Sequence, residues 1–418
     1  MSVKTRIPAP LLWFAVMAFF SSFLFPGLRI MGVPVSPASL IALAFLPIAS
    51  RSYDRPRWRT VAVATTILMG LFALNAVLFG FETRNALYLF IPLGAIGTVA
   101  LVQSLAATYG MLTLQRWALW LCGVNITVMA MQAFNLADIN EKLSFVWSTG
   151  IDFVASSDHE REILKLTLPI RPPGLFPTGI FASTVIYIVC RGIFLYQRKT
   201  WPLLFALFAI LLSANRTLAV ILVAYETISM CRLLGFRKFF TLASGFVFFS
   251  VLTVWGISQA GIDLYLLKFL NEELGDGVGS TASVVERLKT LEIFLENLPK
   301  HALTGGFSSS DLAGVEHVFD SEIMLRTLQF GIIGVVCLVL VILVPRKGER
   351  SDTWAFLFVL AFLASLTTTL TTSVVYAVAL AFYKECVVNV DARTKIIRST
   401  TNKRKQRRRS LWLTPTLT

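Results

Sequence analysis

One arginine stands inside an otherwise apolar stretch of the chain. The run LFALFAILLSANRTLAVILVAYE covers residues 204–226, and Arg216 lies between its two apolar halves with no acidic residue beside it. A charge at membrane depth costs about 2.5–3.5 kcal/mol on insertion scales, so we expect it to have a use. Three uses fit: a guanidinium that snorkels to the membrane surface, a member of a structural ion pair, or an anion-binding group at a membrane face.

The composition indicates which elements must position such a residue. The 418 residues are 56% hydrophobic and 15% charged, with a mean hydropathy of +0.70, which lies outside the range of soluble globular proteins. We therefore expect an all-α polytopic membrane protein, in which each spanning helix needs about 20 mostly apolar residues. Such stretches lie near 10–28, 36–50, 61–80, 87–107, 117–135, 176–196, 201–214, 217–231, 239–257, 324–343, 354–367 and 373–389.

The distribution of charge predicts the topology. If the N-terminus is cytoplasmic, most of the 38 Lys and Arg residues fall on the inner side and most of the 24 acidic residues on the outer side. An even number of spans follows, and twelve fits best, although 201–231 and 354–389 are each readable as one helix. The prediction is a single transmembrane domain over residues 1–389, a basic cytoplasmic tail over 390–418, and both termini in the cytoplasm.

The basic tail and the cysteines limit the partners and cofactors. The tail carries much of the net charge of +14, and KRKQRRRS after a last span favours anionic lipid headgroups over nucleic acid. The first apolar run resembles a signal peptide, but no small-residue cleavage site follows, which favours an uncleaved span. The five cysteines lie in or beside apolar segments and indicate neither a disulfide framework nor a metal site. We expect no cofactor and no metal.

Two segments on the outer side are too long to be turns, and long ordered loops usually carry function. They cover about 137–173 and 258–323. In the second, SVVERLKTLEIFLENL predicts an amphipathic helix that lies on the membrane surface or packs across the spans. Its apolar face would comprise Val284, Leu288, Leu291, Leu295 and Leu298. The following TGGFSSSDLAG is glycine-rich and allows a close backbone approach, but it lacks the P-loop spacing.

The end of that loop carries a recognisable motif. In DSEIMLRTLQFGIIG, Asp320 is followed by Met324 and by Gly331 and Gly334. This resembles the motif that closes the large periplasmic loop in the O-antigen ligase and polymerase family of bacterial polysaccharide assembly. RPPGLFPTGIFAS, LLSANRTLAV and the stretch from STASVVERL to Gly305 and Gly306 agree in order and side with that family. The resemblance covers about 170–335 and implies a GT-C-like membrane fold.

The resemblance also implies a reaction. Family members move a glycan from an undecaprenyl pyrophosphate carrier to an acceptor sugar hydroxyl, with inversion and without metal or nucleotide sugar. The leaving pyrophosphate needs fixed cationic donors, and guanidinium groups match phosphate oxygens in bidentate geometry. By resemblance, Arg171, Arg216 and Arg287 form that clamp.

Each of these arginines has a plainer explanation. Arg216 is also placed to snorkel from the end of a short helix. Arg171 is also suited to order the turn at the two following prolines, and Arg287 to pair with Glu286 on a helix surface. Arg326 lies four residues after Glu322, a spacing that favours an ordinary salt bridge, so we leave it out of the clamp.

Glycosyl transfer also needs a base beside the acceptor hydroxyl. Asp320 occupies the position where ligases of the family have His, and His317 stands three residues earlier. Asp320 is the first candidate for base or hydroxyl orienter and His317 the second. The alternative for Asp320 is an N-cap of the next helix, a role that is compatible with catalysis.

Three functions therefore remain open. The first is a polymerase of undecaprenyl-pyrophosphate-linked repeat units for exopolysaccharide, capsule or O-antigen, in the bacterial plasma membrane and alongside other assembly proteins. The second is an O-antigen ligase, which the absent His disfavours. The third is a transporter or flippase; this class shows internal repeats and broken helices, of which the sequence gives no clear sign.

Overall fold

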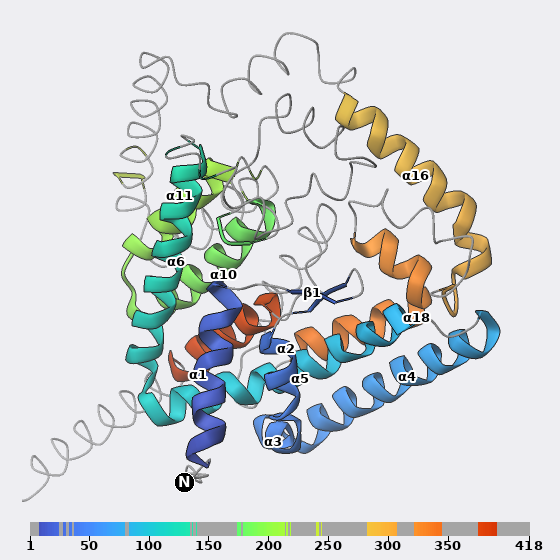
Figure 1. Cartoon of the computed structure of the whole chain (residues 1–418), viewed down its shortest axis with the longest axis horizontal. Coiled ribbons are helices and arrows are strands. Elements are labelled where there is room, and N and C mark those ends of the chain that lie inside the picture. Colours follow the sequence, from blue (N-terminus) through green and yellow to red (C-terminus); the bar gives the residue numbers. More distant parts are fainter. Residues whose placement is uncertain are drawn as a thin grey trace, which may run out of the picture.

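The computed structural model of the chain describes residues 8–24, 28–30, 33–35, 37–79, 83–133, 136, 139, 174–176, 179–213, 215, 218, 240–241, 244, 282–306, 322–344 and 375–390. These residues are almost entirely helical (Figure 1). Four helices are long and apolar enough to cross a membrane: Arg55–Leu78, Pro92–Tyr109, Gly179–Gln197 and Ile323–Leu343. The prediction of a helical membrane protein is confirmed at this level, while the predicted spans near 217–231, 239–257 and 354–367 lie almost wholly outside the described residues.

The centre of the core is α10 (Gly179–Gln197), in which nearly every side chain is buried. α11 (Trp201–Ser213) runs back along α10, and α6 (Met111–Ala133) packs against both. The helix over 375–390 also lies close, because a Cβ atom at Gly192 would be 3.3 Å from the Tyr383 Cα atom. Glycine at this position lets the two backbones approach, as is common between helices in membranes.

A second group of helices is joined to the first by α5 (Thr83–Tyr109). α5 contacts α6 on one side and α1 (Ala9–Leu24) on another. α4 (Arg55–Phe79) and α18 (Glu322–Leu343) pack against each other and also contact α5. α16 (Ala282–His301) packs on α18 at the edge of the molecule (Figure 1).

The expected spanning helix near 36–50 is not continuous. α2 (Pro37–Leu43) is followed by a turn, then by α3 (Leu46–Ala49) and a short 3-10 helix, η1 (Ser50–Ser52). Pro47 explains the break, because proline has no N–H group and its ring clashes with the carbonyl four residues earlier. The prediction of one continuous helix was wrong here because it used the apolar composition of the segment and did not take Pro47 into account.

A small hairpin also departs from the all-α expectation. β1 (Leu28–Ile30) pairs antiparallel with β2 (Val33–Val35) between α1 and α2. The broken segment after the hairpin packs tightly on α5, since a Cβ atom at Gly97 would lie 1.9 Å from the Ala42 carbonyl oxygen. A larger residue at position 97 would therefore push α2 away from α5.

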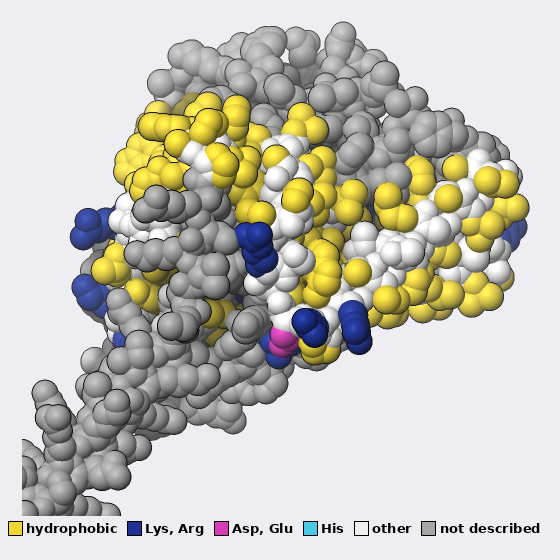
Figure 2. All heavy atoms as spheres, turned by 90° about the horizontal axis from the view of Figure 1, so that it is seen from below, with side chains coloured by type: hydrophobic (Ala, Val, Ile, Leu, Met, Phe, Trp, Pro, Cys, Tyr) yellow, Lys and Arg dark blue, Asp and Glu magenta, His cyan; other side chains and the backbone are white. Residues whose placement is uncertain are grey.

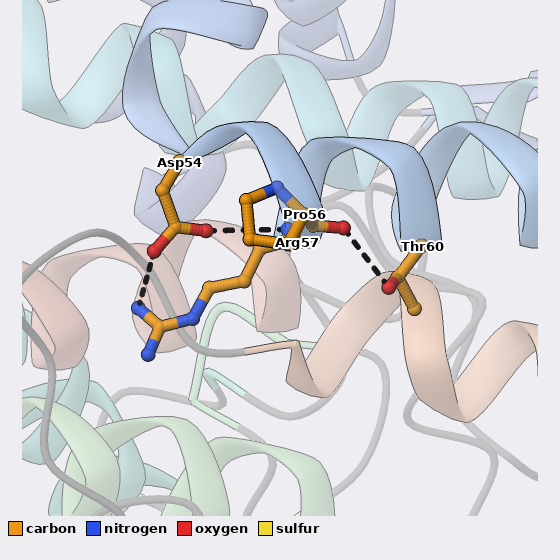
Figure 3. Close-up of polar contacts among 4 residues, drawn as sticks. All are labelled: Asp54, Pro56, Arg57 and Thr60. Carbon is orange, nitrogen blue, oxygen red and sulfur yellow. Dashed lines mark hydrogen bonds and ion pairs between the residues drawn. The ribbon is translucent and has the colours of Figure 1, made fainter.

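The N-terminus of α4 is capped by Asp54, the residue that immediately precedes the helix (Figure 3). The Asp54 side chain accepts a hydrogen bond from the Arg57 backbone N–H at 3.2 Å and lies 3.6 Å from the Arg57 guanidinium. Proline in the first turn, Pro56, loses no helical hydrogen bond, and its carbonyl accepts one from the Thr60 hydroxyl at 3.2 Å. Asp54 thus satisfies an N–H group that the helix leaves open.

The predicted amphipathic helix at the end of the second outer loop is confirmed as α16. The side chains that pack on α18 are Ile293 and Phe294, which contact Leu325 and Leu328. Leu291 and Leu295 of the predicted apolar face are exposed, so they do not pack on α18. The helix is confirmed, and an exposed apolar face fits the expected position at the membrane surface better than packing across the spans.

The outer surface of the described helices is largely apolar. α4 exposes Val63 and Val77, and α18 exposes Ile332 and Val336. Figure 2 shows hydrophobic side chains over much of one face, with Lys and Arg at its edges. Such an arrangement suits contact with lipid chains, because apolar patches of this extent are rare on soluble monomers.

Candidate functional site

Asn215, immediately before Arg216, is fixed to the first turn of α10. It is buried, and its side-chain amide donates to the Ile180 carbonyl at 3.2 Å and to the Ser183 hydroxyl at 3.0 Å. Its side-chain oxygen accepts a hydrogen bond from the Leu218 N–H at 3.2 Å. The backbone that carries Arg216 is therefore anchored at the N-terminus of the most buried helix.

Gly174, three residues after Arg171, is held by α6. The backbone N–H of Gly174 donates to the Gln132 side-chain oxygen at 2.7 Å, and the Gln132 amide donates to the Gly174 carbonyl at 3.2 Å. Gly174 has φ of +64°, and a Cβ atom there would lie 3.0 Å from the Met129 side chain, so glycine is required. Arg171 lies three residues before this anchored turn and thus within about 11 Å of it along the chain.

Asn125 of α6 joins this turn to the first helix. Its side-chain oxygen accepts a hydrogen bond from the Leu175 N–H at 3.1 Å, and its amide donates to the Phe23 carbonyl at 3.1 Å. Phe176 packs against Phe23 and Phe181, with ring centroids 6.4 and 5.7 Å apart. Buried polar bonds and aromatic contacts together hold α1, α6 and the start of α10 in one arrangement.

These contacts hold Asn215 at the start of α10, and Phe176, two residues after Gly174, packs on Phe181 of the same helix. The first backbone N–H groups of a helix lack helical partners and carry a partial positive charge. Anions bind readily at such ends, and two guanidinium groups would add to the attraction. Arg171 and Arg216 themselves lie outside the described residues, and the structure describes only their neighbours in the chain, Gly174 and Asn215.

The four motif glycines gather at a second place, the junction of α16 and α18. α18 is interrupted at Gly331, where φ is +71° and ψ is 173°. The Ile332 N–H donates to the Ala302 carbonyl at 2.8 Å, and the Gly306 N–H donates to the Leu328 carbonyl at 2.8 Å. The segment after α16 thus supplies both partners of the helical hydrogen bond that α18 lacks between Leu328 and Ile332.

Glycine is needed on both sides of this junction. A Cβ atom at Gly305, where φ is +76°, would lie 2.1 Å from the Gln329 carbonyl oxygen. A Cβ atom at Gly331 would lie 2.1 Å from the Leu303 carbonyl oxygen. The close backbone approach expected for the glycine-rich connection is therefore present.

The other two glycines and one asparagine complete the junction. A Cβ atom at Gly306 would lie 2.2 Å from the buried His301 ring, and one at Gly334 would lie 2.4 Å from the Phe330 side chain. Asn75 of α4 is buried, and its amide donates to the Thr304 carbonyl at 2.8 Å. α4, α16 and α18 are thus fastened at one point.

The remaining predicted site residues are only partly described. Asp320 and His317 lie outside the described residues, in the segment bounded by Gly306 and Glu322. Arg287 lies in α16, but the structure does not describe its side chain. α16 packs mainly on α18, whereas Gly174 bonds to α6 and Asn215 bonds to α10.

Two buried cations lie towards the other end of α10. Arg191 donates to the Tyr383 hydroxyl at 2.6 Å, with its guanidinium carbon 5.9 Å from the ring centroid. The Lys384 ammonium donates to the carbonyls of Ile342 and Val344, both at 3.0 Å. Lys384 satisfies the C-terminal carbonyls of α18, so these cations fasten helices to each other.

The polar anchors Asn75, Asn125, Gln132 and Asn215 were missed. Each is a single amide residue in or beside an apolar run, and that isolation is a usable signal, because polar groups buried in a membrane must find partners.

Among the described residues, no group of three His, Cys, Asp or Glu side chains is placed to hold a metal ion. In comparisons with known proteins, no family model and no curated protein matches the chain.

Proposed function

We propose that the protein is a membrane glycosyltransferase that polymerises undecaprenyl-pyrophosphate-linked repeat units at the outer face of the bacterial plasma membrane. The observation that best supports the proposal is that Gly174, three residues after Arg171, bonds to α6, and that Asn215, immediately before Arg216, bonds to the start of α10. A pyrophosphate bound there would meet the positive end of the α10 dipole and two permanent cations. The proposal includes twelve spans, cytoplasmic termini, a GT-C-like fold and a tail over 390–418 on anionic lipids.

The reaction breaks the bond between the anomeric carbon of the donor glycan and a pyrophosphate oxygen. The acceptor hydroxyl oxygen attacks that carbon from the opposite side, and the configuration inverts. Asp320, or His317 in its place, takes the hydroxyl proton, while Arg171, Arg216 and Arg287 hold the pyrophosphate as it leaves with the bonding electrons. No metal or nucleotide sugar enters this scheme.

Anchored backbone favours such a clamp over a snorkelling arginine. Electrostatic stabilisation of a leaving group is strongest when its donors are fixed before the reaction begins. Gln132 holds Gly174, three residues after Arg171, and Asn215, immediately before Arg216, is held at the start of α10. An arginine that only snorkels to the membrane surface does not need hydrogen bonds that fix the neighbouring backbone.

A ligase would share this donor site and differ in its acceptor. Asp320 stands where ligases of the resembled family have His, which favours the polymerase. A transporter is the third candidate, because the interruptions of α18 at Gly331 and between α2 and α3 are features of that class. The loop at 302–306 satisfies the broken backbone of α18, however, so those groups are not open to a transported ion.

The clamp is tested by substitution of Arg216. We expect Arg216→Ala to abolish polymer while the protein remains in the membrane, and Arg216→Lys to lose most activity because a bidentate fork is lost. Arg116→Ala is the matched control, since Arg116 is exposed at the start of α6. Polymer is measured on gels beside an immunoblot of the membrane fraction. Normal polymer from Arg216→Ala would contradict the clamp.

A further inference from the structure

Three exposed arginines stand close together in the chain where α4 begins. Arg51 lies in η1, and Arg55 and Arg59 lie in the first two turns of α4. Arg57, between them, pairs with Asp54 (Figure 3). Among the described side chains, neither Arg55 nor Arg59 has an acidic partner.

The start of a helix is an unfavourable place for cations. The N-terminus of a helix carries a partial positive charge, and two like charges four residues apart destabilise a helix further. The exposed Arg198 and Lys199 are placed differently, because they follow the C-terminus of α10, where the helix dipole attracts positive charge. The arginines of α4 are therefore the ones that a bound anion would stabilise.

The two arginines of α4 continue into exposed apolar residues on the same side of the helix. Arg55, Arg59, Val63 and Ile67 follow one another at intervals of four residues, and Leu74 comes seven residues later. Val63, Ile67 and Leu74, which we call the apolar stripe, are 58, 39 and 42% exposed. The buried side chains of α4 lie on the opposite side: Val61, Ala64, Leu68 and Phe72.

The length of α4 fits a helix that begins at the membrane surface. From Thr60 to Phe79 its rise is about 30 Å, which is the thickness of the hydrocarbon core of a bilayer. Tyr53 and Trp58, whose ring centroids are 6.1 Å apart, stand beside the arginines in the chain, and such rings are enriched at membrane interfaces. Guanidinium groups at this end of α4 thus lie at the level of lipid phosphates.

We propose that Arg55 and Arg59 bind the phosphate of an anionic phospholipid whose acyl chains lie along the apolar stripe of α4. Guanidinium forks match phosphate oxygens, and Arg51 adds to the attraction. The acyl chains remove the stripe from water. Free phosphate or an acidic peptide would match the arginines alone, whereas a phospholipid matches both parts of the surface. The site does not depend on the proposed function.

The test compares two double variants of the purified full-length protein in detergent by native mass spectrometry. Arg55→Gln with Arg59→Gln removes the site, and glutamine is a good helix former, so α4 is kept. Arg198→Gln with Lys199→Gln is the matched control, because it removes the same charge from exposed positions. The probes are dioleoylphosphatidylglycerol, dioleoylphosphatidylcholine, which has the same chains and no net charge, and glycerol phosphate, which has the charge and no chains.

We expect the wild type to bind phosphatidylglycerol about tenfold more tightly than phosphatidylcholine. The α4 double variant should lose this preference, and Arg59→Gln alone should lower it about threefold. The control should change the binding of either lipid less than about twofold.

Equal phosphatidylglycerol binding by the α4 variants and the wild type would overturn the site. An equal loss in the control would also overturn it, because only the total charge would then matter. Displacement of phosphatidylglycerol by an equal concentration of glycerol phosphate would overturn the role of the apolar stripe, since a free anion would then be enough.

Discussion

At the scale of single residues, buried amides hold the described backbone next to the proposed arginines, at Gly174 and Leu218. Asn215 makes three hydrogen bonds and Gln132 makes two to one glycine. Lost bonds of this kind leave buried polar groups unsatisfied, at a cost of about 1–3 kcal/mol each. Activity should therefore depend on residues that never touch substrate.

Asn215→Ala should lower polymer formation and the unfolding temperature together, since the Ile180 carbonyl and the Leu218 N–H both lose a partner. Asn297→Ala is the control, because Asn297 of α16 is partly buried and bonds only the carbonyl of Ile293 in its own helix. Thermal unfolding of purified protein and polymer gels measure the two effects. Equal behaviour of the two variants would contradict an anchoring role for Asn215.

Lys384→Met should destabilise the protein by about 1–3 kcal/mol, because the Ile342 and Val344 carbonyls lose their buried donor. The apolar part of the side chain is kept, so the loss isolates the ammonium group. Lys199→Met at an exposed position should be neutral. Unchanged thermal stability of Lys384→Met would show that water or another group replaces the donor.

At the scale of elements, the junction of α16 and α18 depends on glycine. Gly331→Ala should destabilise the protein strongly, since φ is +71° and the added Cβ would collide with the Leu303 carbonyl. Gly70→Ala on the open face of α4 should be neutral or stabilising, because alanine favours helix. Thermal unfolding compares them. A stable Gly331→Ala protein would mean that α18 closes into a regular helix.

The elements also show what could be predicted from the sequence and why. The 3.6-residue apolar period predicted α16, and apolar length predicted α4, α10 and α18. The break between α2 and α3 was missed because the length and mean hydropathy of a segment do not change noticeably when it contains one proline. The break at Gly331 was missed because glycine is common in membrane helices and only the contact with residues 302–306 fixes its conformation.

The arginines of the candidate site were proposed from the sequence, because they are charges beside apolar runs that the predicted topology puts on one side. The isolation of Asn125, Gln132 and Asn215 in or beside apolar runs signals a buried partner, but the sequence does not show which group that partner is. The identity of the partner depends on tertiary packing.

At the scale of the whole molecule, α6 and α10 must remain adjacent for the candidate site to keep its supports. The Cys122 thiol of α6 contacts the Cys190 thiol of α10, and both are buried. Copper phenanthroline should therefore link them by a disulfide, detected after cleavage at a protease site inserted in 140–170. Cys190→Ser should abolish the link. Two separate fragments from the oxidised wild type would contradict this packing.

The most direct test of the central claim compares lipid-linked saccharides from cells that lack the protein with cells that carry the wild type or Arg216→Ala. We expect single repeat units to accumulate on the carrier in the first and third, because the polymerising transfer has stopped. Full-length carrier-linked chains would identify a ligase instead. Unchanged lipid-linked saccharides would contradict glycosyl transfer and favour the transporter.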